Sequence, residues 1–151
     1  MRVEVQVTQR FRVPAPREQV FELLADVPKA YGHFPNMKRV AAVGERAYRM
    51  EMDEISVAGI SHQVIYACRY TFDSKSGAIS WKPVKDVGNG QIEGGWKLKV
   101  EGDGTHVEFA TTGKLEVEIP LLLRPMATPY VQGMFRSEIG RFLDNVRKAL
   151  S

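Results

Sequence analysis

Two side chains with acid–base chemistry share one face of the segment ISHQVIYACRYTF, residues 60–72. His62 and Tyr66 have the same parity, so an extended strand would point both to one side, two pleats apart. A histidine and a tyrosine that face a cavity can polarise a carbonyl or move a proton. They can equally orient a bound ligand, or they can be core polar groups with backbone partners. His62 and Tyr66 are therefore our catalytic candidates, with all three interpretations open.

A carboxylate falls on the apolar side of the predicted C-terminal helix. At about 100° per residue, Glu138 lies within the arc of Val131, Met134 and Phe142. Burial of an unpaired carboxylate is costly, so we expect Glu138 to have a partner or a raised pKa. Arg141 is a possible partner along the helix. The alternative is a glutamate at the boundary of the apolar face that extends into solvent.

The other chemical side chains form no recognisable motif. The three histidines are far apart and the single cysteine, Cys68, has no evident activating partner, so we expect an inert thiol and no metal site. The sequence has no GxSxG, Walker, HExxH or GxGxxG motif, and we expect no cofactor. GNGQIEGG joins two predicted strands, where Gly94 and Gly95 indicate a bulge or a strong bend.

Soft and flat apolar side chains recur along the predicted strands and the last helix. Each alone is more typical of a core, but together they suit an apolar or aromatic guest. With the polar candidates, the predicted ligand-binding residues are Tyr48, Met50, Met52, His62, Tyr66, Tyr70, Trp81, Trp96, Phe109, Met134 and Glu138.

A sheet and a long helix must position these side chains. Residues 2–13 alternate as a strand, and residues 16–35 predict two short helices with Asp26 as the cap of the second. Six strands are expected between residues 37 and 119, joined by tight turns such as SKSG and EGDG, which favours an antiparallel sheet. Residues 125–150 predict a helix. One helix cannot cover a strongly curved sheet completely, so we expect a cavity between them.

The bulk composition suits a single α+β domain over residues 1–151. Hydrophobic residues make up 44% and charged residues 26%, which excludes disordered and collagen-like classes. The net charge of +3 is scattered among acids, so we expect no nucleic acid partner. One cysteine, no signal-peptide pattern and no long apolar run together predict a cytoplasmic protein.

Two stretches carry a resemblance to a known superfamily: PAPREQVFELLADVPKAYGHFPNMKRV and PLLLRPMATPYVQGMFRSEIGRFLDNVRKAL. They resemble the START-like (SRPBCC) helix-grip superfamily, most of all its polyketide cyclase/dehydrase and coenzyme-Q-binding-protein-like groups. The resemblance covers nearly the whole chain. It implies a curved, roughly seven-stranded antiparallel sheet wrapped around a long C-terminal helix, two short helices after the first strand, and an internal cavity.

The resemblance favours a START-like ligand-binding domain that binds or transports a hydrophobic small molecule: a lipid, an isoprenoid or quinone, or a polyketide. The alternative is a polyketide cyclase/dehydratase-type enzyme that uses the cavity His62 and Tyr66. A second alternative, from another class, is a module that interacts with proteins or the ribosome.

Three leucines in a proline-bounded loop need either burial against other elements or a function at the surface. Leu121, Leu122 and Leu123 can pack on the helices or form a gate. They can also make transient membrane contact, with Arg124 near lipid phosphates.

Overall fold

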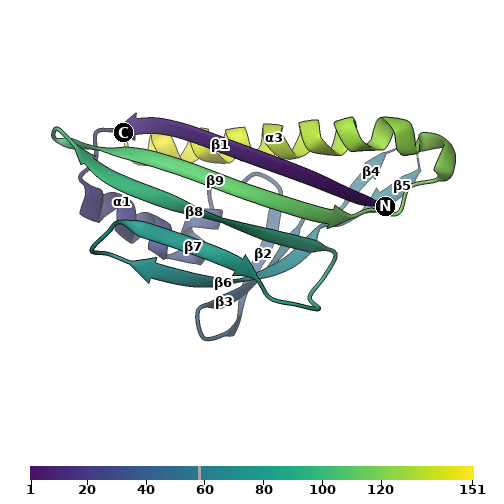
Figure 1. The fold of residues 1–151 in the computed structure, drawn as a ribbon, viewed down its shortest axis with the longest axis horizontal. Coiled ribbons are helices and arrows are strands. Elements are labelled where there is room, and N and C mark those ends of the chain that lie inside the picture. Colours follow the sequence, from purple (N-terminus) through teal and green to yellow (C-terminus); the bar gives the residue numbers. More distant parts are fainter. Residues whose placement is uncertain (58) are drawn as a thin grey trace.

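A curved, open seven-stranded antiparallel sheet forms the body of the molecule, and a long helix runs along it (Figure 1). The computed structural model describes residues 1–57 and 59–151. The strand order is β1-β9-β8-β7-β6-β3-β2. The bounds of these strands are β1 (Arg2–Val13), β2 (Met37–Gly44), β3 (Ala47–Met52), β6 (Ile65–Asp73), β7 (Ala78–Pro83), β8 (Gly90–Glu101) and β9 (Gly104–Glu116). The predicted α+β helix-grip architecture is confirmed.

The C-terminal helix α3 (Arg124–Ala149) packs its apolar stripe on the sheet. Val131, Phe135, Phe142 and Val146 are all buried, as their helical spacing predicts. The alternation along β1 buries Val3, Val5, Val7 and Val13 on the face that the helix covers. A short 3₁₀ helix, η1 (Leu121–Leu123), leads from β9 into α3.

Two short helices close one end of the sheet. β1 ends at Val13, Pro16 with its extended backbone is the N-cap residue of α1 (Arg17–Ala25), and α2 (Val27–Tyr31) follows directly. The Asp26 carboxylate accepts a hydrogen bond of 3.3 Å from the backbone N–H of Lys29, which makes it the predicted cap of α2. Tyr31 and Phe34 then extend aromatic rings toward Phe142 of α3.

Residues 60–72 are not one strand, which corrects the sequence prediction. β5 (Ile60–His62) pairs with β4 (Ile55–Val57) in a separate two-stranded sheet, and only β6 belongs to the main sheet. The chain turns between them because Asn89, in the β7–β8 loop, binds the backbone on both sides of the break. Its amide donates to the Gln63 carbonyl at 2.7 Å and its side-chain oxygen accepts from the Ile65 N–H at 2.9 Å.

The glycine pair of β8 marks a close approach of backbones rather than a bulge. The pairing of β8 with β9 runs without a register shift from Gly90 to Glu101. A Cβ atom on Gly94 would lie 2.2 Å from the Ala110 carbonyl oxygen, so a side chain has no room there. The predicted bulge is therefore wrong, and the strong bend stays a prediction.

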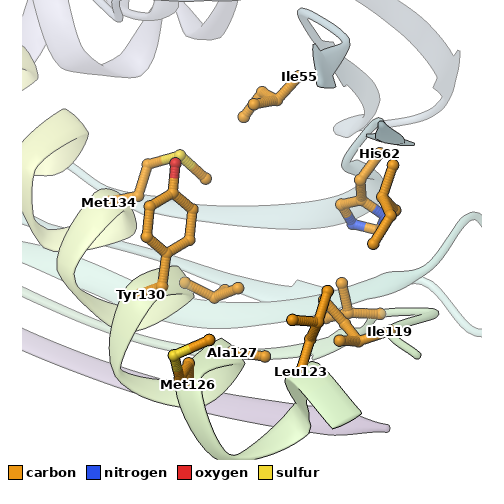
Figure 2. Close-up of a pocket in the computed structure, with 11 residues that line it drawn as sticks. Ile55, His62, Ile119, Leu123, Met126, Ala127, Tyr130 and Met134 are labelled. Atoms are coloured by element: carbon orange, nitrogen blue, oxygen red, sulfur yellow. The ribbon is translucent and has the colours of Figure 1, made fainter. Parts of the chain in front are cut away.

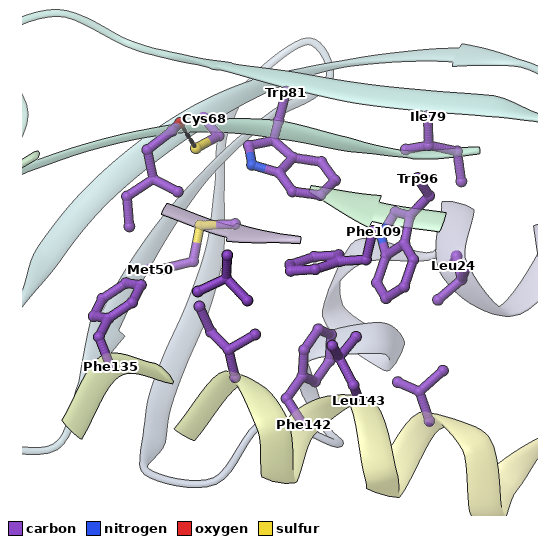
Figure 3. Close-up of a cluster of buried hydrophobic side chains, with 14 of the residues drawn as sticks. Leu24, Met50, Cys68, Ile79, Trp81, Trp96, Phe109, Phe135, Phe142 and Leu143 are labelled. Carbon is purple, nitrogen blue, oxygen red and sulfur yellow. Dashed lines mark hydrogen bonds between the residues drawn. The ribbon is translucent and has the colours of Figure 1, made fainter. Parts of the chain in front are cut away.

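An aromatic cluster fills the space between the middle of the sheet and α3 (Figure 3). Phe109 lies at its centre, with ring centroids 4.7 Å from Trp96, 6.0 Å from Trp81 and 6.4 Å from Phe142. These distances suit tilted and edge-to-face aromatic pairs. The cluster is therefore a packed part of the core.

Candidate functional site

A large apolar-lined space lies beside the N-terminal half of α3 (Figure 2), whereas Phe142 of the aromatic cluster lies in the C-terminal half of that helix. It has a volume of about 320 Å³, near the lower end of the range for small-molecule sites. Its walls are the β4–β5 hairpin, the segment after β9, and the N-terminal half of α3. The residues that line it are Ile55, Ile60, His62, Val117, Ile119, Leu123, Met126, Ala127, Tyr130, Val131 and Met134. We call this space the cavity.

The mouth of the cavity is unusually apolar for a protein surface. Leu122 is 92% exposed and Leu121 is 73% exposed, next to the lining residue Leu123. Met126 and Tyr130, in the first turns of α3, are also exposed and line the cavity (Figure 2). A rim of this kind offers an apolar molecule a route from the surface into the cavity.

A narrow space adjoins the cavity and changes its chemistry. It has a volume of about 30 Å³ and shares Ile55, His62, Val131 and Met134 with the cavity. Its remaining lining residues are Asn36, Met52, Asp53, Val64, Leu115, Phe135 and Glu138. We call this space the extension. It brings an amide, two carboxyl groups and an imidazole to one end of an otherwise apolar site.

Glu138 is the buried carboxyl group of the extension. It is only 6% exposed, and its Oε1 accepts a hydrogen bond of 2.9 Å from the Asn36 amide. Burial raises the pKa of Glu138, as does nearby Asp53, while the Asn36 bond and the charge of Arg141 offset part of the rise. The expectation of a partner and a raised pKa is confirmed, but the hydrogen-bond partner is Asn36 and not Arg141.

His62 stands at the junction of the cavity and the extension. Its ring lies on the hairpin side, across the cavity from Tyr130 and Met134 (Figure 2). Its Nε2 is buried and has no hydrogen-bond partner among the described residues. Burial lowers the pKa of His62, which favours the neutral ring. A neutral imidazole can donate or accept one hydrogen bond at Nε2.

The raised pKa of Glu138 predicts a specific dependence of stability on pH. Between the usual glutamate pKa of 4.5 and the higher folded value, the folded protein binds more protons than the unfolded chain. Stability therefore falls as the pH rises through this window. Relative to Glu138→Gln, the wild type should lose stability there. Urea unfolding of both proteins across this range measures the difference.

The difference curve isolates Glu138 from the charged groups that face it, namely Asp53, Arg141 and His62. A flat difference curve for Glu138→Gln would contradict the prediction.

The structure divides the predicted ligand-binding residues between two places. Met52, His62, Met134 and Glu138 line the cavity or the extension. The predicted residues Tyr70, Trp81, Trp96 and Phe109 surround a gap of only about 10 Å³ within the aromatic cluster. Their contact with a ligand stays a prediction.

The catalytic candidates His62 and Tyr66 belong to different sheets. His62 is on β5, whereas Tyr66 is on β6 and pairs with Met50 of β3. Tyr66 and Met50 are buried in the core, and Tyr48 packs edge-on against Tyr70 at 5.9 Å. Burial raises the pKa of Tyr66, and nearby Tyr31 and Cys68 add to the rise. His62 therefore faces the cavity, and Tyr66 lies within the core.

Sequence reasoning missed most of the cavity wall. Ile55, Ile60, Val117, Ile119 and Ala127 line it and were not among the predicted ligand-binding residues. One usable signal was the apolar loop at residues 120–123, because exposed leucines beside a helix start mark a surface that needs a cover. The Asn36 contact gave no signal, because it joins residues 102 positions apart.

Two kinds of feature are absent from the described part of the chain. Within residues 1–57 and 59–151, no group of three or more His, Cys, Asp or Glu side chains is placed to hold a metal ion. In the same part of the chain, no helix is both long and apolar enough to cross a membrane.

A curved open sheet wrapped around a long C-terminal helix defines the START-like fold, and the apolar cavity lies between the N-terminal half of that helix, the β4–β5 hairpin and the segment after β9 rather than between the helix and the main sheet. The sequence model of the family described as "Polyketide cyclase / dehydrase and lipid transport" matches residues 4–151, so the chain belongs to this family. None of the curated proteins matches the sequence.

Solved structures share the fold at low sequence identity. A Thermus thermophilus protein is 23% identical with a TM-score of 0.62, covering 98% of this chain and 99% of that one. The Zhui aromatase/cyclase from a Streptomyces species is 18% identical with a TM-score of 0.63, covering 97% and 91%. A START superfamily protein from Mycobacterium smegmatis is 15% identical with a TM-score of 0.63, covering 97% and 99%. At these identities the likeness concerns the fold.

Proposed function

We propose that this domain binds a hydrophobic small molecule, such as a lipid, an isoprenoid or quinone, or a polyketide, in the cavity between the β4–β5 hairpin and α3. The observation that carries the proposal is the cavity of about 320 Å³, whose lining is apolar except for His62 and the Tyr130 hydroxyl. Burial of apolar ligand surface supplies about 25 cal/mol per Å² before the costs of association. The family's description, which includes lipid transport, supports the proposal.

Mass spectrometry of an organic extract from the purified, folded protein tests this function. We expect a co-purified apolar molecule in stoichiometric amount, or stoichiometric uptake when the empty protein is titrated with the neutral dye Nile red. A folded protein that yields no extractable ligand and takes up no dye would contradict the proposal.

The exposed rim supports a way of loading the ligand from a membrane. Leu121 and Leu122 project from η1 beside the mouth, with Arg124 following them in the chain, while Leu123 turns toward the cavity. Transient membrane contact would then use Leu121 and Leu122 as the inserted side chains. Co-sedimentation with phospholipid vesicles should weaken when both are replaced by serine, and unchanged binding would refute this contact.

A catalytic role is the second candidate function, because two ionisable side chains line the extension of the cavity. The Nε2 of His62, which has no hydrogen-bond partner among the described residues, and the buried Glu138 carboxyl line the same extension. Such groups suit proton transfer to a bound polyketide-like substrate. His62→Ala should then abolish turnover, whereas ligand affinity should fall only several-fold. Loss of binding alone would refute the catalytic version.

A further inference from the structure

The cavity and the extension together form a site with two chemically different ends. The cavity contributes hydrocarbon side chains, whereas the extension contributes the polar groups of Asn36, Asp53, His62 and Glu138. The four shared lining residues make the two spaces neighbours, so one ligand can contact both. The inference below rests on the proposed function and concerns which head group a ligand carries into the extension.

The size of the extension limits that head group. Its volume of about 30 Å³ is about a tenth of that of the cavity. A small uncharged group therefore fits there more readily than a carboxylate, which would have to lose its hydration shell. Asn36 and Asp53 are exposed at the edge of the extension, but six of its lining side chains are buried, so a charge deep in it would be only partly solvated: Met52, Val64, Leu115, Val131, Phe135 and Glu138.

The charges around the extension also disfavour an anionic head group. Two acids, Asp53 and Glu138, line it, and the described lining residues include no lysine or arginine. Arg141 is the cation whose charge acts on Glu138, but it is exposed on α3 and does not line the space. An anionic head group would meet like charge and lose its hydration, both of which weaken binding.

The hydrogen-bonding groups favour a neutral partner instead. The Asn36 amide occupies Oε1 of Glu138, which leaves Oε2 for a ligand. The Nε2 of His62 is buried without a partner among the described residues, and an unsatisfied buried nitrogen is costly. A hydroxyl can donate to the Glu138 carboxylate and accept from the Nε2–H of His62, and a keto oxygen can accept from the Nε2–H of His62.

We propose that the site selects an apolar molecule that carries an uncharged hydroxyl or keto group, bound between His62 and Glu138, and that it discriminates against the corresponding carboxylate. Neutral alcohols, phenols and ketones are thus the favoured ligands, and fatty-acid-like anions are disfavoured. Glu138 and His62 are the specificity-determining residues, and Asn36 positions the Glu138 carboxyl.

Three probes with one apolar body test this selection: naphthalene, naphthol and naphthoate, titrated calorimetrically into the protein at neutral pH. We expect naphthol to bind about tenfold more tightly than naphthoate and several-fold more tightly than naphthalene. His62→Phe should remove the advantage of naphthol over naphthalene, measured as the ratio of the two affinities in the same variant. Retention of that advantage in His62→Phe would overturn the inference.

A second variant tests the charge argument directly. Glu138→Gln keeps an oxygen for the Asn36 amide and removes the charge. It should therefore raise the affinity for naphthoate and reduce the ratio of the naphthol affinity to the naphthoate affinity. The control Glu118→Gln removes an exposed carboxylate between two cavity-lining residues, Val117 and Ile119, and should leave the ratio unchanged. If this affinity ratio fell equally in both variants, Glu138 would not be the residue that discriminates against the carboxylate.

The outcomes separate this inference from the proposed function. If naphthoate binds wild type as tightly as naphthol does, the head-group selection is wrong and the apolar site stands. If none of the three probes binds the folded protein, the proposed function fails and the inference fails with it.

Discussion

Ala127→Trp should abolish binding of apolar ligands while the protein stays folded. Ala127 is buried, lies in the first turns of α3 and lines the cavity. An indole at this position fills space that a ligand would occupy. If it displaces about 120 Å² of buried ligand surface, the loss is about 3 kcal/mol, or about a hundredfold in affinity. Nile red titration of wild type and variant measures the effect.

A matched control separates the filling of the cavity from the presence of a large side chain on α3. Gly133 lies on the same helix, is exposed, and would place a Cβ atom in open space. Gly133→Trp should therefore bind Nile red as wild type does. Circular dichroism should show both variants folded. Undiminished binding by a folded Ala127→Trp would place the ligand outside the cavity and contradict the proposed site.

The elements of the fold could be predicted because their signals are local. The alternation of Val3, Val5 and Val7, the cap at Asp26 and the helical stripe around Phe142 each depend on neighbours within a few residues. The period of two also continues through Gln63 and Val64, where the chain leaves one sheet for another. That break depends on Asn89, which is more than twenty positions away in the sequence. A local pattern carries no information about it.

Only part of the candidate site could be predicted, because the signals in the sequence are local. Helical periodicity places Met134 and Glu138 on the inner face of α3, and the structure confirms that position. Periodicity does not tell whether an inward side chain faces a cavity or a packed neighbour. Trp96 and Phe109 face inward too, but Tyr31 and Phe34 from the short-helix segment approach Phe142 and help close that end.

A substitution of Phe109 tests whether the aromatic cluster is close-packed core, in contrast to the open cavity at the other end of α3. Phe109→Ala should destabilise the protein by about 3–5 kcal/mol, because it removes a buried ring that contacts Trp81, Trp96 and Phe142. Such a loss is a large fraction of the stability of an ordinary domain. Thermal and urea unfolding measure it. A change below about 1 kcal/mol would show that the ring is not part of a close-packed core.

The milder Phe109→Leu tests whether the aromatic cluster also binds ligand. It should cost about 1–2 kcal/mol of stability and leave the protein folded. Because the gap beside Phe109 is only about 10 Å³, Nile red affinity should stay within about twofold of wild type. A tenfold loss of affinity would mean that the cluster opens to admit ligand. In that case Trp81, Trp96 and Phe109 would be ligand contacts, as their positions in the sequence predict.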